Sequence, residues 1–445
     1  MKIKTLLLTF LLLAASSVLF AQTNKIEFQE YDLDNGLHVI LHQDNSFPLV
    51  VVTITYHVGS KNEKPERTGF AHFFEHLMFE GSANIPRGEY SKIVDRAGGT
   101  LNANTTWDRT FFYEVLSSNQ LELGLWLESE RMLHLNVDSI GIATQKKVVT
   151  EEIKQREDNQ PYMSFQREVV KRAFVEHPYR WTVLGKAEHI LTATDKDYKT
   201  FYNDFYVPNN AVITIAGDIN FDQAKKLIAK YYKDIPASKK EIYRPKQIEP
   251  IKHKEIRDTI YDNIQLPAIF QAYHTPKSGT TDYYAVDMLA TLLSGGESSR
   301  FYKVLVDEKQ LAMQAMSFPF PYEDAGLAFA FALPNMGVEL QDLETAMDTE
   351  IERVQNEPIS DKELQKLKNQ YEVNNVNSNA TLESRAINLA MAYTFHKDAN
   401  LVNTEINKYL AVTKEDIMRV AKEYFRKDNR VVLYYLPKSQ QKDLK

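Results

Sequence analysis

The pattern of apolar and polar positions changes several times along the chain, and each change predicts an element. An alternating stretch at residues 31–33 is followed by Asn35-Gly36 and by a second apolar run at 37–41. Alternation predicts strands and Asn-Gly predicts a tight turn, so a β-hairpin is expected here. Residues 49–56 are rich in β-branched side chains and predict a further strand.

Helical periodicity replaces this alternation near residue 68 and continues to Gly81, a residue type that suits a helix C-terminus. The other elements expected in the first half are a helix at 89–97, a strand at 111–116, mostly helix over 121–176, a helix at 196–206 and a strand at 211–215. Interspersed helices and short strands of this kind predict an α+β fold.

The second half repeats this order. Tyr56-His57 has a counterpart in Tyr273-His274, 217 residues later, and residues 206–210 resemble residues 424–430 before the next apolar run. Such a period predicts two similar lobes, each a mostly antiparallel sheet packed with helices, related by internal duplication. We expect the first lobe at 22–235 and the second at 259–445. The linker is expected at 236–258, where prolines and lysines are frequent.

The amino terminus has the pattern of a secretory signal peptide at residues 1–21. Lys2 and Lys4 precede an apolar run at 6–20, and the small Ala21 precedes a polar residue. An uncleaved amino-terminal anchor is the alternative. No other stretch approaches the roughly 20 apolar residues of a membrane helix, so no membrane span is expected after cleavage. The predicted location is outside the cytoplasm, in the periplasm of a Gram-negative bacterium.

Composition excludes several kinds of function. The formal net charge of −7 is small, and lysines and acidic residues are interspersed, so neither nucleic acid nor an anionic membrane surface is an expected partner. The chain has no cysteine, which excludes disulfides and thiolate ligands. Any metal site is therefore expected to use His, Asp and Glu.

The segment 69–79 contains the motif His72-x-x-Glu75-His76 inside the first predicted helix. Residues four apart share a helix face, so His72 and His76 are placed to bind one ion together. Glu75 lies to the side, within reach of a water on that ion. This order is the inverse of HExxH. The alternative is that both histidines only pack within the helix surface.

A catalytic zinc has three protein ligands and one open position, so a third ligand is required. Glu152, on a helix expected at 144–156, is the best candidate. Glu151 competes with it. Adjacent helical residues point about 100° apart, so only one of these two carboxylates is expected to bind the metal. The other is expected to face solvent or to contact one of the metal ligands without binding the metal itself.

Several motifs together resemble the pitrilysin and insulinase peptidases, the inverzincins, and in particular the zinc-motif-bearing subunit of their smaller, bacterial processing-peptidase-like branch. The resemblance covers nearly the whole mature chain. The motifs are HFFEHLMFEGS at 72–82, GGTLNANTTWDRTFFYE at 98–114, QKKVVTEEI at 145–153, DNQPY at 158–162, HPYRW at 177–181 and LSGGESSRFYKVL at 293–305.

The resemblance implies roles for individual residues. Glu152 follows Val148-Val149 at the family's spacing and becomes the third ligand, with Glu151 as its neighbour and Gln145 at an outer position that is often glutamate. The segment Leu101-Asn102-Ala103 becomes an exposed strand edge that receives the substrate main chain, and Asn102 is a candidate to hold a carbonyl near the metal.

The expected activity is that of a zinc-dependent endopeptidase with one zinc ion per chain, acting on short or unfolded peptides. Zinc would acidify its bound water, and Glu75 would remove the proton and later deliver it to the leaving amine. Two rival hypotheses are a non-catalytic assembly or peptide-binding subunit of the same fold, and a structural zinc protein.

One departure from the family concerns an arginine and a tyrosine in the second lobe that bind substrate and stabilise the oxyanion. The alignment places Val306 and Met313 at these positions, and neither side chain donates a strong hydrogen bond. Arg300 and Tyr302 are interpreted as packing or surface residues. We therefore expect a heterodimer in which a paralogous subunit supplies the Arg/Tyr pair, in preference to a homodimer.

Overall fold

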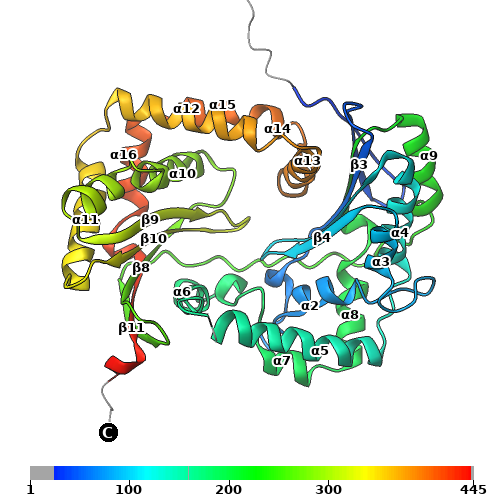
Figure 1. The fold of residues 1–445 in the computed structure, drawn as a ribbon, viewed down its shortest axis with the longest axis horizontal. Helices are drawn as coiled ribbons and strands as arrows, with labels where there is room; N and C mark the ends of the chain where they lie inside the picture. Colours follow the sequence, from blue (N-terminus) through cyan, green and yellow to red (C-terminus); the bar gives the residue numbers. More distant parts are fainter. Residues whose placement is uncertain (1–24, 159, 442–445) are drawn as a thin grey trace, which may run out of the picture.

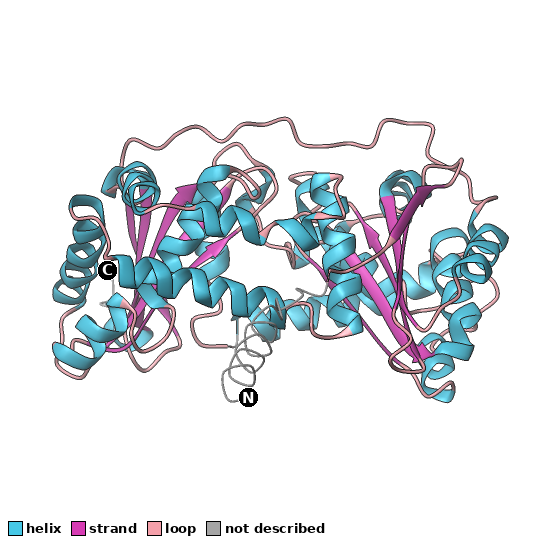
Figure 2. Ribbon diagram, turned by 90° about the horizontal axis from the view of Figure 1, so that it is seen from above, coloured by secondary structure: helices cyan, strands magenta, loops and turns pink. Residues whose placement is uncertain are grey.

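The structure is a computed structural model that describes residues 25–158 and 160–441, so the signal peptide predicted at 1–21 lies outside the described residues. The chain forms two lobes of similar topology, each built on one sheet with helices around it (Figure 2). The α+β class and the two similar lobes were both predicted from the sequence. Among the described residues, no helix combines the length and apolar content needed to cross a bilayer.

The first lobe holds a six-stranded sheet in the order β1-β2-β6-β3-β5-β4. Its neighbouring strands are antiparallel except for β2 and β6. The strands are β1 Gln29–Asp32, β2 His38–Gln43, β3 Leu49–Tyr56, β4 Thr100–Thr105, β5 Thr110–Ser117 and β6 Ala211–Gly217. The helices are α2 Phe70–Leu77, α3 Tyr90–Arg96, α4 Leu121–Leu133, α5 Ser139–Ile153, α6 Phe165–Ala173, α7 Ala187–Thr192, α8 Asp195–Phe205 and α9 Phe221–Tyr232.

The second lobe holds a five-stranded sheet in the order β7-β11-β8-β10-β9, which repeats the first order without β1. Its strands are β7 Ile256–Asp262, β8 Ala268–Thr275, β9 Ala312–Phe320, β10 Gly326–Pro334 and β11 Arg430–Pro437. Its helices are α10 Thr281–Ser294, α11 Leu340–Asn356, α12 Asp361–Asn377, α13 Leu382–His396, α14 Leu401–Thr404, α15 Ile406–Ala411 and α16 Lys414–Tyr424.

The repeated Tyr-His pairs lie at equivalent positions in the two sheets. Tyr56 is opposite Ala211 in the first sheet, and Tyr273 is opposite Arg430 in the second. The asparagine before each of these partners holds the same corner, because Asn210 donates to the carbonyl of Phe205 and Asn429 to that of Tyr424, both at 2.8 Å. The registers therefore allow residues of one lobe to be matched with residues of the other.

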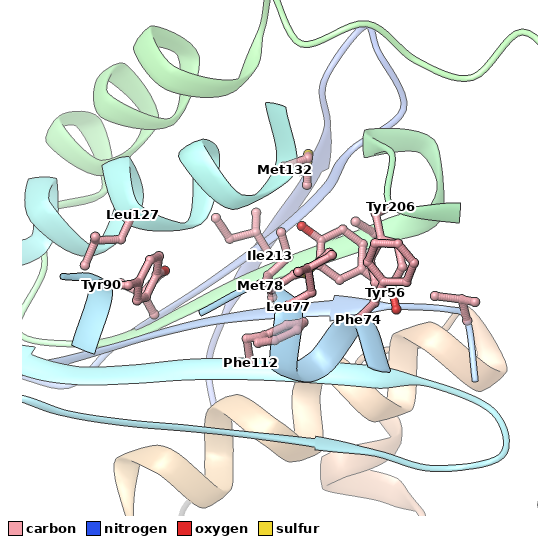
Figure 3. Close-up of a cluster of buried hydrophobic side chains, with 14 of the residues drawn as sticks. Tyr56, Phe74, Leu77, Met78, Tyr90, Phe112, Leu127, Met132, Tyr206 and Ile213 are labelled. Atoms are coloured by element: carbon pink, nitrogen blue, oxygen red, sulfur yellow. The ribbon is translucent and has the colours of Figure 1, made fainter. Parts of the chain in front are cut away.

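The core of the first lobe lies between the sheet and the helices packed on one of its faces, one of which is α2. Alternate residues of β3 point to this side, and they pack with Phe74 and Leu77 of α2 and with Tyr206 (Figure 3). Phe74 and Leu77 are fully buried. Each side chain of this size contributes about 1.5–3 kcal/mol when buried, so the apolar face of α2 is what holds the helix against the sheet.

The two lobes exchange helices. Helix α13 lies between β10 and β11 of the second sheet in the chain but packs on the first sheet, where Ala386 forms one buried cluster with Val51 and Ala216. Helix α6 comes from the first half but packs on the second sheet, where Val170 joins a cluster with Phe270. Figure 1 shows α13 beside the first sheet and α6 beside β8 and β11.

Some boundaries differ from the sequence predictions. Helix α2 begins at Phe70, because Gly69 has φ +91°, and it ends at Leu77, before the expected Gly81. Helix α5 begins earlier than expected, because Asp138 caps it by accepting the N–H of Gly141 at 2.8 Å. Strand β7 begins at Ile256, inside the segment expected as a linker, and residues 236–255 contain no helix or strand.

Candidate metal centre and strand edge

Helix α2 is anchored at its N-terminus by a buried carboxylate. Glu63 accepts the main-chain N–H groups of Gly69 and Ala71, each at 2.8 Å. These N–H groups have no partner within the helix, and an anion is favoured at this end by the helix dipole. With its apolar residues turned to the core, α2 presents His72, Glu75 and His76 away from the core.

Three donor atoms from two helices meet beside α2. The Nε2 atoms of His72 and His76 are 3.3 Å apart. Oε2 of Glu152, on α5, is 3.0 Å from Nε2 of His76 and 3.6 Å from Nε2 of His72. Bonds of about 2.05 Å at a tetrahedral angle separate two zinc ligands by about 3.3 Å. The three donors therefore fit one tetrahedral zinc ion with a fourth position open.

The electrostatics favour the forms of these donors that bind metal. Burial lowers the pKa of His72 to about 4, so its imidazole is neutral at neutral pH. A hydrogen bond from His76 lowers the pKa of Glu152 below its ordinary value. A neutral imidazole and a carboxylate are the forms that bind a cation, so little proton release is needed on metal binding.

Glu75 lies beside these donors without belonging to them. Its Oε2 accepts a hydrogen bond from Oγ1 of Thr105 at 2.5 Å, and Thr105 is the last residue of β4. Burial raises the pKa of Glu75. A carboxylate with a raised pKa takes up and releases a proton nearer neutral pH, which suits a general base.

Glu151 and Gln145, which the sequence analysis placed around the metal ligands, form hydrogen bonds with other residues. Glu151 is exposed and accepts from Gln155 at 3.3 Å, and Gln145 donates to Glu80 at 2.6 Å. No hydrogen bond joins either side chain to the three donors in the part of the chain that is described. The Glu152 carboxylate instead pairs through Oε1 with Nε of Arg156 at 2.9 Å.

Sequence reasoning did not find Arg156 or Thr105. Arg156 follows Glu152 by four residues, so helical spacing was an available signal for it. Thr105, at the end of strand β4, contacts Glu75 on helix α2, and no local pattern in the sequence points to that contact.

Strand β4 is at the edge of the first sheet and has no partner strand on its outer side. The N–H of Thr106 donates to the carbonyl of Arg109 at 2.8 Å, and bonded and non-bonded pairs alternate along an antiparallel ladder. The main-chain groups of Leu101, Ala103 and Thr105 therefore face the free edge. This open edge ends at Thr105, beside Glu75.

Asn102 has a different environment from its neighbours. Successive side chains of a strand point to opposite faces, so Asn102 lies on the face away from Leu101 and Ala103, which pack on the core of the first lobe. Its Oδ1 accepts the N–H of Ala103 at 2.8 Å, and no bond joins it to the three donors in the described residues. A contact between Asn102 and a carbonyl at the metal stays a prediction.

The equivalent edge of the second lobe is closed. The registers match Ala103 with Ser317 and Thr105 with Pro319 on strand β9. The hydroxyl of Ser294 accepts the N–H of Ser317 and donates to its carbonyl, both at 2.7 Å. Pro319 has no N–H to offer. A side chain of the protein thus occupies the place where an added strand would pair.

The second lobe supplies no strong donor at the two aligned positions. Val306 is half-buried in a π-helical turn, Tyr302–Glu308, and Met313 is exposed at the start of β9. Arg300 forms an ion pair with Glu363 at 3.1 Å, as expected for a packing or surface residue.

Comparisons with known proteins agree with this architecture. The insulinase family (peptidase family M16) matches residues 38–187, and the domain described as peptidase M16 inactive domain matches residues 192–371. The zinc protease PqqE of Helicobacter pylori is 31% identical over 431 residues, which cover 96% of this chain and 97% of that protein.

Solved structures have the same two-lobed fold. A protease from Helicobacter pylori superposes with a TM-score of 0.87 at 29% identity, covering 92% of this chain and 100% of that chain. The periplasmic protease PqqL from Escherichia coli superposes with a TM-score of 0.77 at 19% identity, covering 93% of this chain and 48% of that chain. The chain thus belongs to the insulinase family of peptidases, M16, whose related proteins include zinc proteases.

Proposed function

We propose that this chain is a zinc-dependent endopeptidase that hydrolyses short or unfolded peptides, with one zinc ion held by His72, His76 and Glu152. The observation that carries the proposal is the triangle of donors, with separations of 3.3, 3.0 and 3.6 Å, beside the half-buried Glu75 carboxylate, which is not part of it. A structural zinc site closes all four positions with protein ligands, and this one has three.

The residues of the chain divide the reaction between them. The free edge of β4 at Leu101, Ala103 and Thr105 pairs with the main chain of an extended peptide and so places a carbonyl beside the donors. When bound, zinc would supply a Lewis acid that polarises this carbonyl and acidifies the attacking water. Glu75 takes the proton of that water on its free carboxylate oxygen and returns it to the leaving amine.

We also propose that the protein acts together with a partner subunit and is located outside the cytoplasm. Val306 and Met313 stand where an arginine and a tyrosine are required, so we propose a heterodimer whose paralogous subunit donates both groups to the oxyanion. An exported, periplasmic location is supported by the pattern at residues 1–21 and by the name of the periplasmic relative PqqL.

The test is cleavage of an unbiased peptide library by the purified mature chain with its zinc quantified, alone and mixed with a paralogue that carries the Arg/Tyr pair. Glu75→Gln is the control, because it keeps the three ligands and removes the base. Cleavage only in the mixture, lost in Glu75→Gln, supports the whole proposal. Full activity of the chain alone refutes the need for a partner, and zinc-loaded but inert protein in both samples indicates a peptide-binding or assembly subunit.

A further inference from the structure

We infer that Thr105 is a positioning residue that aims the carboxylate of Glu75 and joins the catalytic base to the peptide-binding edge. The inference rests on the proposed function, which it deepens by naming what orients the base. Three observations carry it: the contact itself, the rigidity of the strand end, and an anchor that the second lobe provides for that strand end.

The contact is short and has no competitor among the described residues. Oγ1 of Thr105 lies 2.5 Å from Oε2 of Glu75, and no other hydrogen bond to the Glu75 side chain is formed by the described residues. Both residues are half-buried. The terminal torsion of a glutamate is broad, so a single directed bond decides which way its oxygens point.

Thr105 is held by its own strand and not by the helix that carries Glu75. It pairs with Thr110, whose buried hydroxyl donates to the carbonyl of Val58 at 2.8 Å. The turn that follows is closed by Oγ1 of Thr106, which accepts the N–H groups of Asp108 and Arg109 at 3.2 Å. Because a threonine has few χ1 rotamers, the hydroxyl at the end of this strand is preset.

The second lobe anchors the tip of the same hairpin. Trp107 is buried against Tyr322, with ring centroids 4.9 Å apart, and Asp108 accepts the N–H of Glu323 at 3.2 Å. Asp108 also accepts from Tyr179 at 2.6 Å. Figure 1 shows the β9–β10 hairpin reaching toward β4. The peptide-binding edge of β4 and the Thr105 hydroxyl that orients Glu75 therefore belong to one hairpin, whose tip is fixed by contacts with the second lobe.

The chemistry requires a hydroxyl at this position. It donates to one oxygen of the ionised Glu75, so the other oxygen stays free to take the proton of the water. After that transfer the hydroxyl can remain a donor or become an acceptor, because it has both capacities. Valine has the shape of threonine without either capacity, and serine has both capacities with more rotational freedom.

The experiment compares Thr105→Val and Thr105→Ser in the full mature chain, zinc-loaded and mixed with the partner if the partner is required. Thr100→Val is the matched control, since Thr100 is exposed at the other end of β4. For Thr105→Val we expect kcat to fall about ten- to a hundredfold, as for a misplaced catalytic group, with KM changed by less than about twofold. Zinc affinity is expected to stay unchanged, and Thr105→Ser and Thr100→Val are expected to stay within about threefold of wild type in kcat.

Three results would overturn the inference: unchanged kcat in Thr105→Val, a loss confined to KM, or equal loss in Thr105→Ser. A crystal structure of Thr105→Val gives a readout that is independent of activity. The inference expects the Glu75 carboxylate to turn from its wild-type orientation, and an unmoved carboxylate overturns it even if the wild type proves inert. An inert wild type with a turned carboxylate in the variant would refute only the proposed peptidase function.

Discussion

Replacement of Lys61 by methionine tests the contact between the lobes. Its side chain is 2% exposed, and its Nζ lies 2.6 Å from Glu323, 2.8 Å from Asp324 and 2.9 Å from Asp108. Glu323 and Asp324 come from the second lobe, so this one ammonium group joins both lobes. Lys61→Met keeps the length of the side chain and leaves three carboxylates together without their cation.

The expected cost follows from this geometry. Removing one partner of a buried ion pair costs about 3–5 kcal/mol, because the remaining charge stays desolvated and unpaired. Three carboxylates lose their cation here, and Glu323 keeps one partner in His57, at 2.7 Å. We expect the free energy of unfolding to fall by about 4 kcal/mol near neutral pH. Lys303→Met is the control, because its exposed pair with Glu308 at 3.8 Å contributes less than about 1 kcal/mol.

The loss of unfolding free energy in Lys61→Met should become smaller as the pH falls. Burial opposes ionisation of Glu323, but hydrogen bonds and charges from His57 and Lys61 outweigh it and lower its pKa to about 2. In wild type this pairing stabilises the fold above the unfolded pKa of about 4.5, and the contribution is lost as the pH falls toward 2. In Lys61→Met the carboxylates take up protons more easily, so the difference from wild type should narrow at low pH.

Urea unfolding at about pH 7.5 and about pH 5 measures both effects. A loss below about 1 kcal/mol at neutral pH would refute the view that this buried cation joins the lobes. A loss that grows as the pH falls would refute the assigned charge states.

Three further predictions concern the donors, the closed edge and the exchanged helices. Glu152→Gln should weaken zinc binding by more than about a hundredfold in a competition assay, whereas Glu151→Gln should leave it within about twofold; equal effects would refute the choice of ligand. Ser294→Ala should accelerate amide hydrogen exchange at Ser317 by about tenfold or more, and an unchanged rate would show that the hydroxyl does not close the edge. Residues 22–235 expressed alone should lack cooperative thermal unfolding, because α13 is missing from the first sheet, and a sharp transition would contradict this.

Much of the fold follows from local pattern. The β-branched run predicted at 49–56 is strand β3 at Leu49–Tyr56, because a short run of β-branched and apolar residues that is buried on both faces can be recognised from its own residues. The hairpin around Asn35-Gly36 and the repeat of Tyr56-His57 at Tyr273-His274 were visible for the same reason. Within the site, His72, Glu75 and His76 were found together because one helical turn brings them together.

Contacts between distant segments were decided only by the tertiary structure. Periodicity alone did not decide which of Glu151 and Glu152 lies beside the histidines. The packing of α5 against α2 turns Glu152 to the histidines and Glu151 to solvent. The bond from Thr105 to Glu75 and the closure of β9 by Ser294 each join a strand to a helix. The exchange of α6 and α13 between the lobes left no mark in the sequence, because an amphipathic helix records that one face is buried and not which sheet buries it.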